Sequence, residues 1–528
     1  MRFGLDIRAT RLIGVCLVAV LLGLAAVERS AEADASDAYV MVRLTFDLQS
    51  GTATGEARYP DGDIKPILIQ RGSLAETVDP FDGYIGPTGA LLPVDAGWLP
   101  MTPGAAIGWD VTVEAPDGFL AAPYPDGDVS NGVTRFRLAA GVARAPLIVG
   151  PFKMAERTVG DIKVRTFFTD ANRRLEGAYL DAAGAAIEAL AAEIGPYPYG
   201  AFAVVESPLP VGLGYPGYTL VSGSILPYPF MRGRSLWHEI AHVWFGNGVF
   251  VEYAQGNWAE GFAAYFADYG LARRAGADAA KAMRYDWLLE YDAVPPAEDI
   301  PLRAFVSKSH GQSQAIGYGK AAMTLHMLRV EIGDAAFKAG IARFWRDNRF
   351  TVADWDDIQA AFEAESGRDL GPFFARWIDG TGALPPNSND DAFNSFRKLA
   401  PQERIVTLRA SLASGAFDIR MLSGAPADAA ALTTALRPLG RASPDGAPLY
   451  VGDMDALSAI FDRLPPEPTA GAIFAGTDKA GAVALGLIAP DVATAAVLAG
   501  RLRHYLRWSW VVMEPAGRPR RGRWAPGQ

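Results

Sequence analysis

Hydrophobic and polar residues alternate near the N-terminus, at residues 40–48. Between residues 40 and 48 every second side chain is apolar, which is the period of a half-buried strand. Proline, glycine and aspartate clusters separate further strand-like runs at residues 109–114, 133–138 and 146–149. The pattern therefore predicts an N-terminal β domain at residues 34–156, built as an antiparallel sandwich.

From about residue 173 the apolar residues recur at the spacing of a helix. Residues 173–194 are rich in Ala, Leu and Ile at helical spacing, with Asp170 as the expected cap and Gly195 as the expected end. A strand is predicted at residues 202–206, and helical spacing recurs beyond it. We expect a mainly helical domain at residues 157–385.

A linker of proline, asparagine and serine marks a second boundary at residues 385–390. Beyond it, the pattern predicts one helix and three strands, at residues 491–505, 472–475, 482–488 and 508–513. Residues 386–528 are thus expected to form a small accessory α/β domain. The whole chain is predicted to be a multidomain α+β protein.

The first 33 residues have the features of a secretory signal. Three arginines precede an apolar run at residues 12–27, and small residues follow at 31–33. The run is shorter than the roughly 20 residues of a membrane span, so we expect cleavage and a secreted or periplasmic protein without stable membrane insertion. The alternative is an anchor formed by an uncleaved signal. The only cysteine, Cys16, lies in this segment, so the exported body offers no thiolate ligand.

Length and charge narrow the function class. A chain of 528 residues is too long for one core. Its formal net charge of −10 argues against a nucleic-acid-binding surface, and we expect no nucleic-acid partner. The sequence does not indicate the oligomeric state.

The sequence His-Glu-Ile-Ala-His at residues 238–242 predicts a metal site. His238 and His242 are four residues apart, so on a helix their imidazoles share one face and reach one ion. Glu239 points elsewhere and is poorly placed as a ligand. It is well placed to hydrogen-bond a water on the metal, as a general base must.

A catalytic zinc needs three protein ligands and one open position. Glu260 is the best candidate for the third ligand, because it lies in a second amphipathic run, at residues 257–266, that can fold back on the first helix. Two imidazoles and one carboxylate are the ligand set of zinc hydrolases. We predict one zinc ion per chain, bound by His238, His242 and Glu260.

Two stretches resemble the gluzincin family of aminopeptidase N. They are His-Glu-Ile-Ala-His-Val-Trp-Phe-Gly-Asn at residues 238–247 and Trp-Ala-Glu-Gly-Phe-Ala-Ala-Tyr-Phe at residues 258–266. In that family eighteen residues usually separate the second histidine from the glutamate. Here residues 243–259 intervene, one fewer, and the missing residue falls in the loop at 253–256, where a deletion need not disturb either helix.

The resemblance covers about residues 202–385 and implies a thermolysin-like, mainly helical zinc peptidase domain. The family's oxyanion-stabilising tyrosine matches Tyr318, in the segment Gly-Tyr-Gly-Lys at 317–320. An acid that orients a metal-bound imidazole usually stands where this chain has Ala267. Asp268 follows one position later and is the candidate here.

The chain departs from the family at the substrate loop. The family's Gly-x-Met-Glu-Asn motif, whose glutamate binds the substrate's free amino group, is replaced by Gly214, Tyr215, Pro216 and Gly217. These four residues are the expected substrate-binding positions. Since the nearest acid in sequence is Glu206, on the preceding strand, exopeptidase activity is in doubt.

The sequence thus predicts an exported zinc metallopeptidase that acts on a peptide or protein, with Glu239 as the base and Tyr318 as the oxyanion donor. One alternative is a zinc-retaining peptide-binding protein without turnover; the presence of Glu239 and Tyr318 argues against it, because binding needs neither. Another is a hydrolase of a non-peptide substrate, since fold does not settle substrate.

Overall fold

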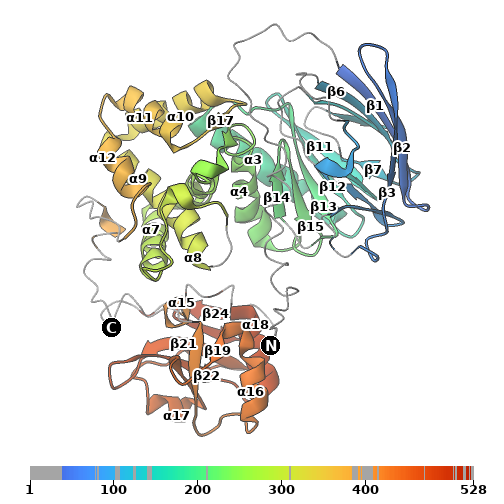
Figure 1. Cartoon of the computed structure of the whole chain (residues 1–528). Helices are drawn as coiled ribbons and strands as arrows, with labels where there is room; N and C mark the ends of the chain where they lie inside the picture. Colours follow the sequence, from blue (N-terminus) through green and yellow to red (C-terminus); the bar gives the residue numbers. More distant parts are fainter. Residues whose placement is uncertain are drawn as a thin grey trace, which may run out of the picture. The chain divides into compact units, whose positions relative to one another are not determined.

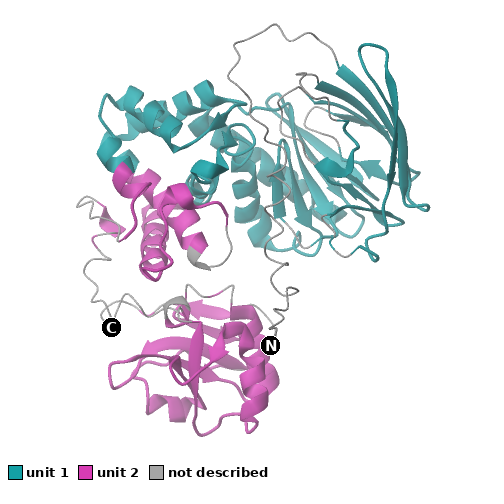
Figure 2. Cartoon of the chain, viewed as in Figure 1, with its two compact units in different colours: residues 1–271, 328–374 teal, residues 272–327, 375–528 magenta. Residues whose placement is uncertain are grey.

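The computed structural model describes residues 39–77, 79, 82–100, 108–122, 127–138, 146–209, 212–307, 311–382, 390–392, 394, 408–412, 415–468, 470–502, 505, 508–514, 519–522 and 524. The predicted signal and residues 385–389 of the predicted linker lie outside these ranges. The chain divides into two compact units, Met1–Leu271 with Leu328–Phe374, and Ala272–Met327 with Ala375–Gln528 (Figure 2). None of the helices in the described part is both long and apolar enough to span a bilayer.

The first unit begins with a six-stranded sheet. Its strands are β1 (Tyr39–Asp47), β2 (Thr52–Arg58), β3 (Ile64–Gln70), β6 (Gly108–Glu114), β8 (Asp128–Ser130) and β9 (Val133–Leu138), in the order β3-β2-β1-β6-β9-β8 (Figure 1). Side chains of β1 alternate between buried and exposed, as predicted. The prediction of a purely antiparallel sandwich is wrong at one pair, because β1 and β6 run parallel. After β2 and β3 the chain forms two strands of a second sheet before β6 returns to the side of β1, so this connection is a crossover and not a hairpin.

That second sheet has four strands. They are β4 (Tyr84–Gly86), β5 (Gly89–Leu92), β7 (Leu120–Ala121) and β10 (Leu147–Gly150), in the order β4-β5-β10-β7. Val42 and Val111 of the six-stranded sheet share one hydrophobic core with Leu92 and Ile148 of the four-stranded sheet. Burial of these apolar faces against each other gives the sandwich-like arrangement.

A third sheet leads to the candidate site. Its strands are β11 (Lys153–Val159), β12 (Ile162–Phe168), β13 (Ala201–Ser207), β14 (Gly212–Tyr215) and β15 (Tyr218–Ser222), in the order β11-β12-β13-β15-β14. The helix α3 (Glu176–Ile194) lies between β12 and β13 in the chain and ends at Gly195, as predicted. The prediction that Asp170 caps this helix is wrong, because a 3-10 turn, η3 (Arg173–Leu175), stands between Asp170 and α3. Asn172, which precedes η3, donates from its side chain to Glu206.

The helices of the first unit surround a cluster of aromatic rings. They include α4 (Leu236–Ala241), α5 (Ala259–Ala263), α10 (Asp334–Asn348) and α11 (Trp355–Ser366). The ring of the buried Phe262 packs against Phe245, Trp258, Phe344 and Trp355. This core fixes α5 on α10 and α11, so the helix that carries Glu260 has a rigid base.

Tyr318 lies on a π-helical turn of the second unit, η8 (Ala315–Lys320), which runs into α9 (Ala321–Ile332). The helix α7 (Ala277–Asp292) and the 3-10 turn η7 (Leu302–Ala304) precede it in the chain.

A seven-stranded sheet forms the C-terminal part of the second unit. Its strands are β18 (Ala416–Met421), β19 (Arg441–Ala442), β20 (Ala447–Val451), β21 (Gly471–Thr477), β22 (Val483–Ile488), β23 (Trp510–Met513) and β24 (Arg520–Gly522), in the order β19-β18-β20-β22-β21-β23-β24. The predicted strands correspond to β21, β22 and β23, and the predicted helix to α18 (Val492–Leu502).

Candidate metal centre

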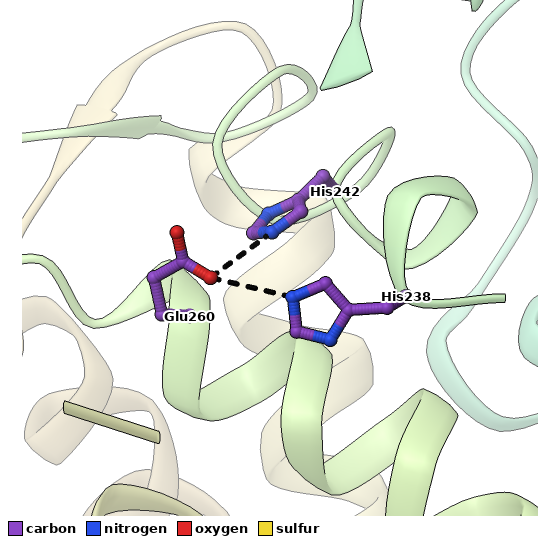
Figure 3. Close-up of side chains that lie close together, drawn as sticks. All are labelled: His238, His242 and Glu260. Atoms are coloured by element: carbon purple, nitrogen blue, oxygen red, sulfur yellow. Dashed lines mark hydrogen bonds and ion pairs between the residues drawn. The ribbon is translucent and has the colours of Figure 1, made fainter. Parts of the chain in front are cut away.

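Two imidazoles and one carboxylate converge in the first unit (Figure 3). The Nε2 atoms of His238 and His242 each lie 3.3 Å from Oε2 of Glu260. The three potential ligand atoms are all within 4.8 Å of one another. The structure therefore brings together the three residues that the sequence predicts as ligands: His238 from α4, His242 from the C-cap of α4 and Glu260 from α5.

The other ring nitrogen of each histidine has its own partner. Nδ1 of His242 lies 3.0 Å from the carbonyl oxygen of Phe245, and Nδ1 of His238 lies 3.4 Å from Oδ2 of Asp268. Arg234 donates from Nε to the other oxygen of Asp268 at 3.0 Å. These contacts hold both rings with Nε2 toward Glu260, which is the orientation in which both nitrogens can bind one metal ion.

A tight turn supplies the partner of His242. Gly246 has a φ of 109°, which favours glycine, and it ends the reversal that follows α4. A methyl group on Gly246 would lie 3.6 Å from Cβ of Ala259 and 3.8 Å from Nδ1 of His242. Gly246 thus brings this turn close to His242 and to Ala259, at the start of the helix that carries Glu260.

Asp268 reaches His238 because its helix contains a π-helical turn. A regular helix repeats about every 3.6 residues, so a residue seven positions after Glu260 faces the same side and one eight positions after it does not. The segment η6 (Ala264–Tyr269) is π-helical and accommodates one extra residue. This turn explains why Asp268, and not position 267, carries the acid in this chain.

Electrostatics within the cluster shift the protonation of its members. Burial opposes charge on the imidazole of His238, but hydrogen bonds to Asp268 and Glu260 outweigh it and raise the pKa of His238 well above its usual value. Burial also opposes charge on His242, yet its pKa is raised by the carboxylate of Glu260.

The carboxylates respond in opposite directions. Burial acts to raise the pKa of Glu260, but the two histidines lower it well below its usual value. The pKa of Asp268 falls to about 2, because its hydrogen bond to His238 outweighs the effect of burial. Burial raises the pKa of Glu239, which is the direction that makes a carboxylate a stronger base.

Glu239 lies against the edge strand β14. A methyl group on Gly214 would come within 3.0 Å of Oε2 of Glu239 and 3.6 Å of Cβ of His242. A side chain at this position would crowd the carboxylate of Glu239, so glycine allows the backbone of β14 to come close to the predicted base.

The donor set fits zinc. Two neutral imidazoles and one carboxylate form a three-ligand site, and the spacing of their donor atoms allows one ion to contact all three. Among the described residues, this is the one cluster of at least three such side chains.

Residues 234–377 match the family described as peptidase family M1 domain, and this span includes the whole cluster. Residues 234–377 are thus an M1 peptidase domain, as the resemblance to the gluzincin family of aminopeptidase N implies.

Curated relatives also match part of the chain. Aminopeptidase N of Streptomyces lividans is 27% identical over 213 residues, which cover 36% of this chain and 24% of that protein. Tricorn protease-interacting factor F2 of Thermoplasma acidophilum is 28% identical over 176 residues, covering 30% and 21%. Aminopeptidase A of Gloydius brevicauda is 31% identical over 150 residues, covering 26% and 15%. The matches thus span no more than a quarter of the length of these relatives.

Solved structures also resemble the chain. An M1 zinc metallopeptidase from Deinococcus radiodurans aligns with a TM-score of 0.49 and 19% identity, covering 66% of this chain and 96% of that one.

The predicted substrate loop precedes residue 234, where the M1 domain match begins. In the structure it is a strand pair, β14 and β15, and not a loop. Tyr215 and Tyr218 are paired across a hairpin, and their rings stack with centroids 5.1 Å apart. Pro216 and Gly217 form its tip, and the φ of 71° at Gly217 is what the third position of a type II turn requires. Gly214, Tyr215, Pro216 and Gly217 thus lie in or beside the edge strand near Glu239, and the hairpin carries no acidic side chain among residues 212–222.

Glu206 is committed elsewhere. Its carboxylate accepts hydrogen bonds from the backbone and hydroxyl of Thr169, at 2.8 and 3.0 Å, and from the amide of Asn172 at 2.9 Å. Its side chain therefore ties β13 to the segment between β12 and η3 and is no substitute for the missing glutamate.

Tyr318 of the M1 domain belongs to the second unit, on η8, and is half-buried. Its ring packs edge-on against Phe305, with centroids 6.3 Å apart.

Sequence reasoning missed Arg234 and the carbonyl of Phe245. Arg234 stands four residues before His238, and this spacing is a signal that could have found it. A backbone carbonyl gives no such signal.

Proposed function

We propose that this protein is an exported zinc metallopeptidase of the aminopeptidase N type that hydrolyses peptide bonds. The observation that carries the proposal is the convergence of His238, His242 and Glu260, with Glu239 next to them and outside the ligand set. One zinc per chain follows from the single cluster found among the described residues.

Zinc, when bound, polarises a carbonyl and makes water more acidic. Glu239 accepts a proton from the attacking water at its carboxylate and passes it to the departing amine. The raised pKa of Glu239 favours the first transfer, because a more basic carboxylate takes up a proton more readily. Tyr318 donates its phenolic proton in a hydrogen bond to the oxyanion of the tetrahedral intermediate.

An extended peptide suits the edge strand. β14 pairs with β15 on one side and ends the sheet on the other, so the row of backbone groups along its outer edge can bind a substrate strand. The approach of Gly214 to Glu239 orients this edge toward the predicted base. We therefore assign Gly214, Tyr215, Pro216 and Gly217 to substrate binding.

The same hairpin argues against strict recognition of a free amino terminus. A buried ammonium needs a charged partner, and its desolvation is unfavourable without one. The hairpin has no acid, and the carboxylate of Glu206 is occupied by Thr169 and Asn172. Internal or amino-blocked peptide bonds are accordingly proposed as substrates.

Export and domain organisation complete the proposal. The arginines and apolar run at the start of the chain support secretion or a periplasmic location. The proposed domains are a signal at 1–33, a β domain at 34–156, a thermolysin-like catalytic domain at 157–385 and an accessory domain at 386–528.

Metal analysis with a ligand variant tests the proposal. The purified protein should contain one zinc ion per chain, and Glu260→Ala should lose most of it, because two imidazoles alone bind zinc more weakly. Glu206→Gln is the matched control: it changes a buried acid outside the ligand set and should retain zinc. Absence of zinc in the wild type, or full zinc in Glu260→Ala, would contradict the ligand assignment.

A further inference from the structure

We infer that Phe305 is a positioning residue for Tyr318, acting through the glycine that precedes the tyrosine. The inference rests on the proposed role of Tyr318 as the oxyanion donor. It concerns what holds the phenol, and every contact that carries it lies within the second unit.

The ring of Phe305 lies directly on the backbone of Gly317. A methyl group on Gly317 would be only 2.1 Å from Cζ of Phe305, which is well inside van der Waals contact. Phe305 is 1% exposed, and its ring meets that of Tyr318 edge-on at an interplanar angle of 80°. One ring therefore touches both the backbone and the side chain of the segment that carries the phenol.

A second ring lies on the other flanking glycine. Cδ1 of Trp287, on α7, would be 3.3 Å from a methyl group on Gly319. Both neighbours of Tyr318 are thus glycines covered by aromatic side chains. The π-helical turn η8 is less regular than an α-helix, and such packing restricts its movement.

Residues 378–380 accept hydrogen bonds from both η8 and η7. Lys320 is 2% exposed and donates from Nζ to the carbonyl of Gly380 at 3.0 Å. Arg303, two residues before Phe305, donates to Asp379 at 2.7 Å and from its backbone to Ile378 at 3.3 Å. Residues 378–380 therefore hold η7, which presents Phe305, and η8, which presents Tyr318.

The physical consequence is a fixed phenol. An oxyanion donor is effective only when it is already in place, because reorganisation during the reaction costs rate. A displacement of about 1 Å is enough to cost about a hundredfold. The ring of Phe305 on Gly317 prevents such a displacement from the side of η7.

A double-mutant cycle tests the inference. Phe305→Leu should lower kcat by about ten- to a hundredfold on an internally quenched peptide, with little change in KM or zinc content. In the Tyr318→Phe background, the same change should cost less than about threefold, because the hydroxyl that it misplaces is gone. Gly317→Ala displaces the ring from the opposite side and should give the same pattern. Phe417→Leu, equally buried in the C-terminal core, is the control and should leave kcat unchanged.

Binding of a phosphinic peptide that mimics the tetrahedral oxyanion gives a readout without turnover. Its affinity should fall in Phe305→Leu and in Tyr318→Phe, and no further in the double variant. Additive losses, or wild-type behaviour of Phe305→Leu and Gly317→Ala beside a slow Tyr318→Phe, would overturn the inference alone. A wild-type rate in Tyr318→Phe, or a wild-type protein that neither cleaves nor binds these peptides, would instead overturn the proposed function on which it rests.

Discussion

The two histidines of the metal centre are held by partners of different kinds. His238 meets the side chain of Asp268, which Arg234 holds in turn, whereas His242 meets the backbone carbonyl of Phe245. The sequence predicts the ligands because two histidines on one helix face and a following acidic helix form a recognisable pattern. It does not predict the carbonyl partner, because every residue has a backbone carbonyl and only the folded geometry determines which one meets the imidazole.

Loss of the charge on Asp268 should weaken zinc binding. We expect Asp268→Asn to lower the zinc affinity about ten- to a hundredfold, because the carboxylate makes His238 a stronger donor and fixes its ring. Competition with a chelating dye measures this affinity. Glu206→Gln changes another buried acid and should bind zinc as the wild type does; equal affinities of all three proteins would remove Asp268 from the metal centre.

Protons should compete with zinc at this centre. The pKa values of His238 and His242 are raised in the metal-free protein, and zinc binds only neutral imidazoles. Below these raised pKa values, the apparent zinc affinity should therefore fall as the pH is lowered, by up to about a hundredfold per unit when two protons are displaced. Calorimetry in two buffers of different ionisation enthalpy counts the protons released on binding. Binding that is independent of pH between 6 and 8 would contradict this expectation.

Among the elements, π-helical turns accompany each part of the predicted machinery. η4 (Met231–Ser235) leads into α4, η6 follows α5, and η8 leads into α9. Such turns are rare and recur at functional sites. Their hydrogen-bond pattern has no composition signal, so the sequence predicts these helices but not their π turns.

Removal of one residue from η6 should be tolerated. Deletion of Ala267 closes the wide turn into an α-helical one and puts the acid seven positions after Glu260, still facing His238. The zinc affinity should stay within about threefold of the wild type. Insertion of an alanine at the same place is the control and should weaken binding, because it turns Asp268 away. A deletion that abolishes zinc binding in a folded protein would show that the π turn does not act as a register adjustment.

Strand patterns were equally informative up to a limit. Alternation located β1, because burial of one face imposes a period of two, and strand-like runs between turn residues located β6, β9 and β10. The parallel pairing of β1 with β6 was not predicted, since alternation does not encode the identity or direction of a neighbour. From the sequence we predict a loop at Pro216, although proline followed by glycine is typical of a tight turn between paired strands, which is what the structure has.

For the molecule as a whole, the M1 domain match covers residues 234–377 and draws on both units. The sequence could predict this domain because its chemistry is concentrated in short segments. The C-terminal sheet carries no comparable cluster of potential metal ligands among its described residues, so its role does not follow from its chemistry.

The lack of an acid in the hairpin predicts substrate preference for the whole protein. A peptide acetylated at its first residue should be cleaved at least as well as its free counterpart, because the hairpin at residues 212–222 offers no carboxylate to the ammonium. Initial rates on the two peptides, which differ only by the acetyl group, give the comparison. A preference of about a hundredfold for the free amine, or about 3 kcal/mol, would show that another acid recognises it.

Glu239 is proposed to act as the base beside a bound zinc. The hydrolysis rates of the acetylated peptide by the wild type and by Glu239→Gln, at equal zinc content, test this role. An amide cannot accept the proton, so the variant should retain zinc and lose activity by about two to four powers of ten. A zinc-loaded Glu239→Gln protein that cleaves the peptide at the wild-type rate would contradict the account.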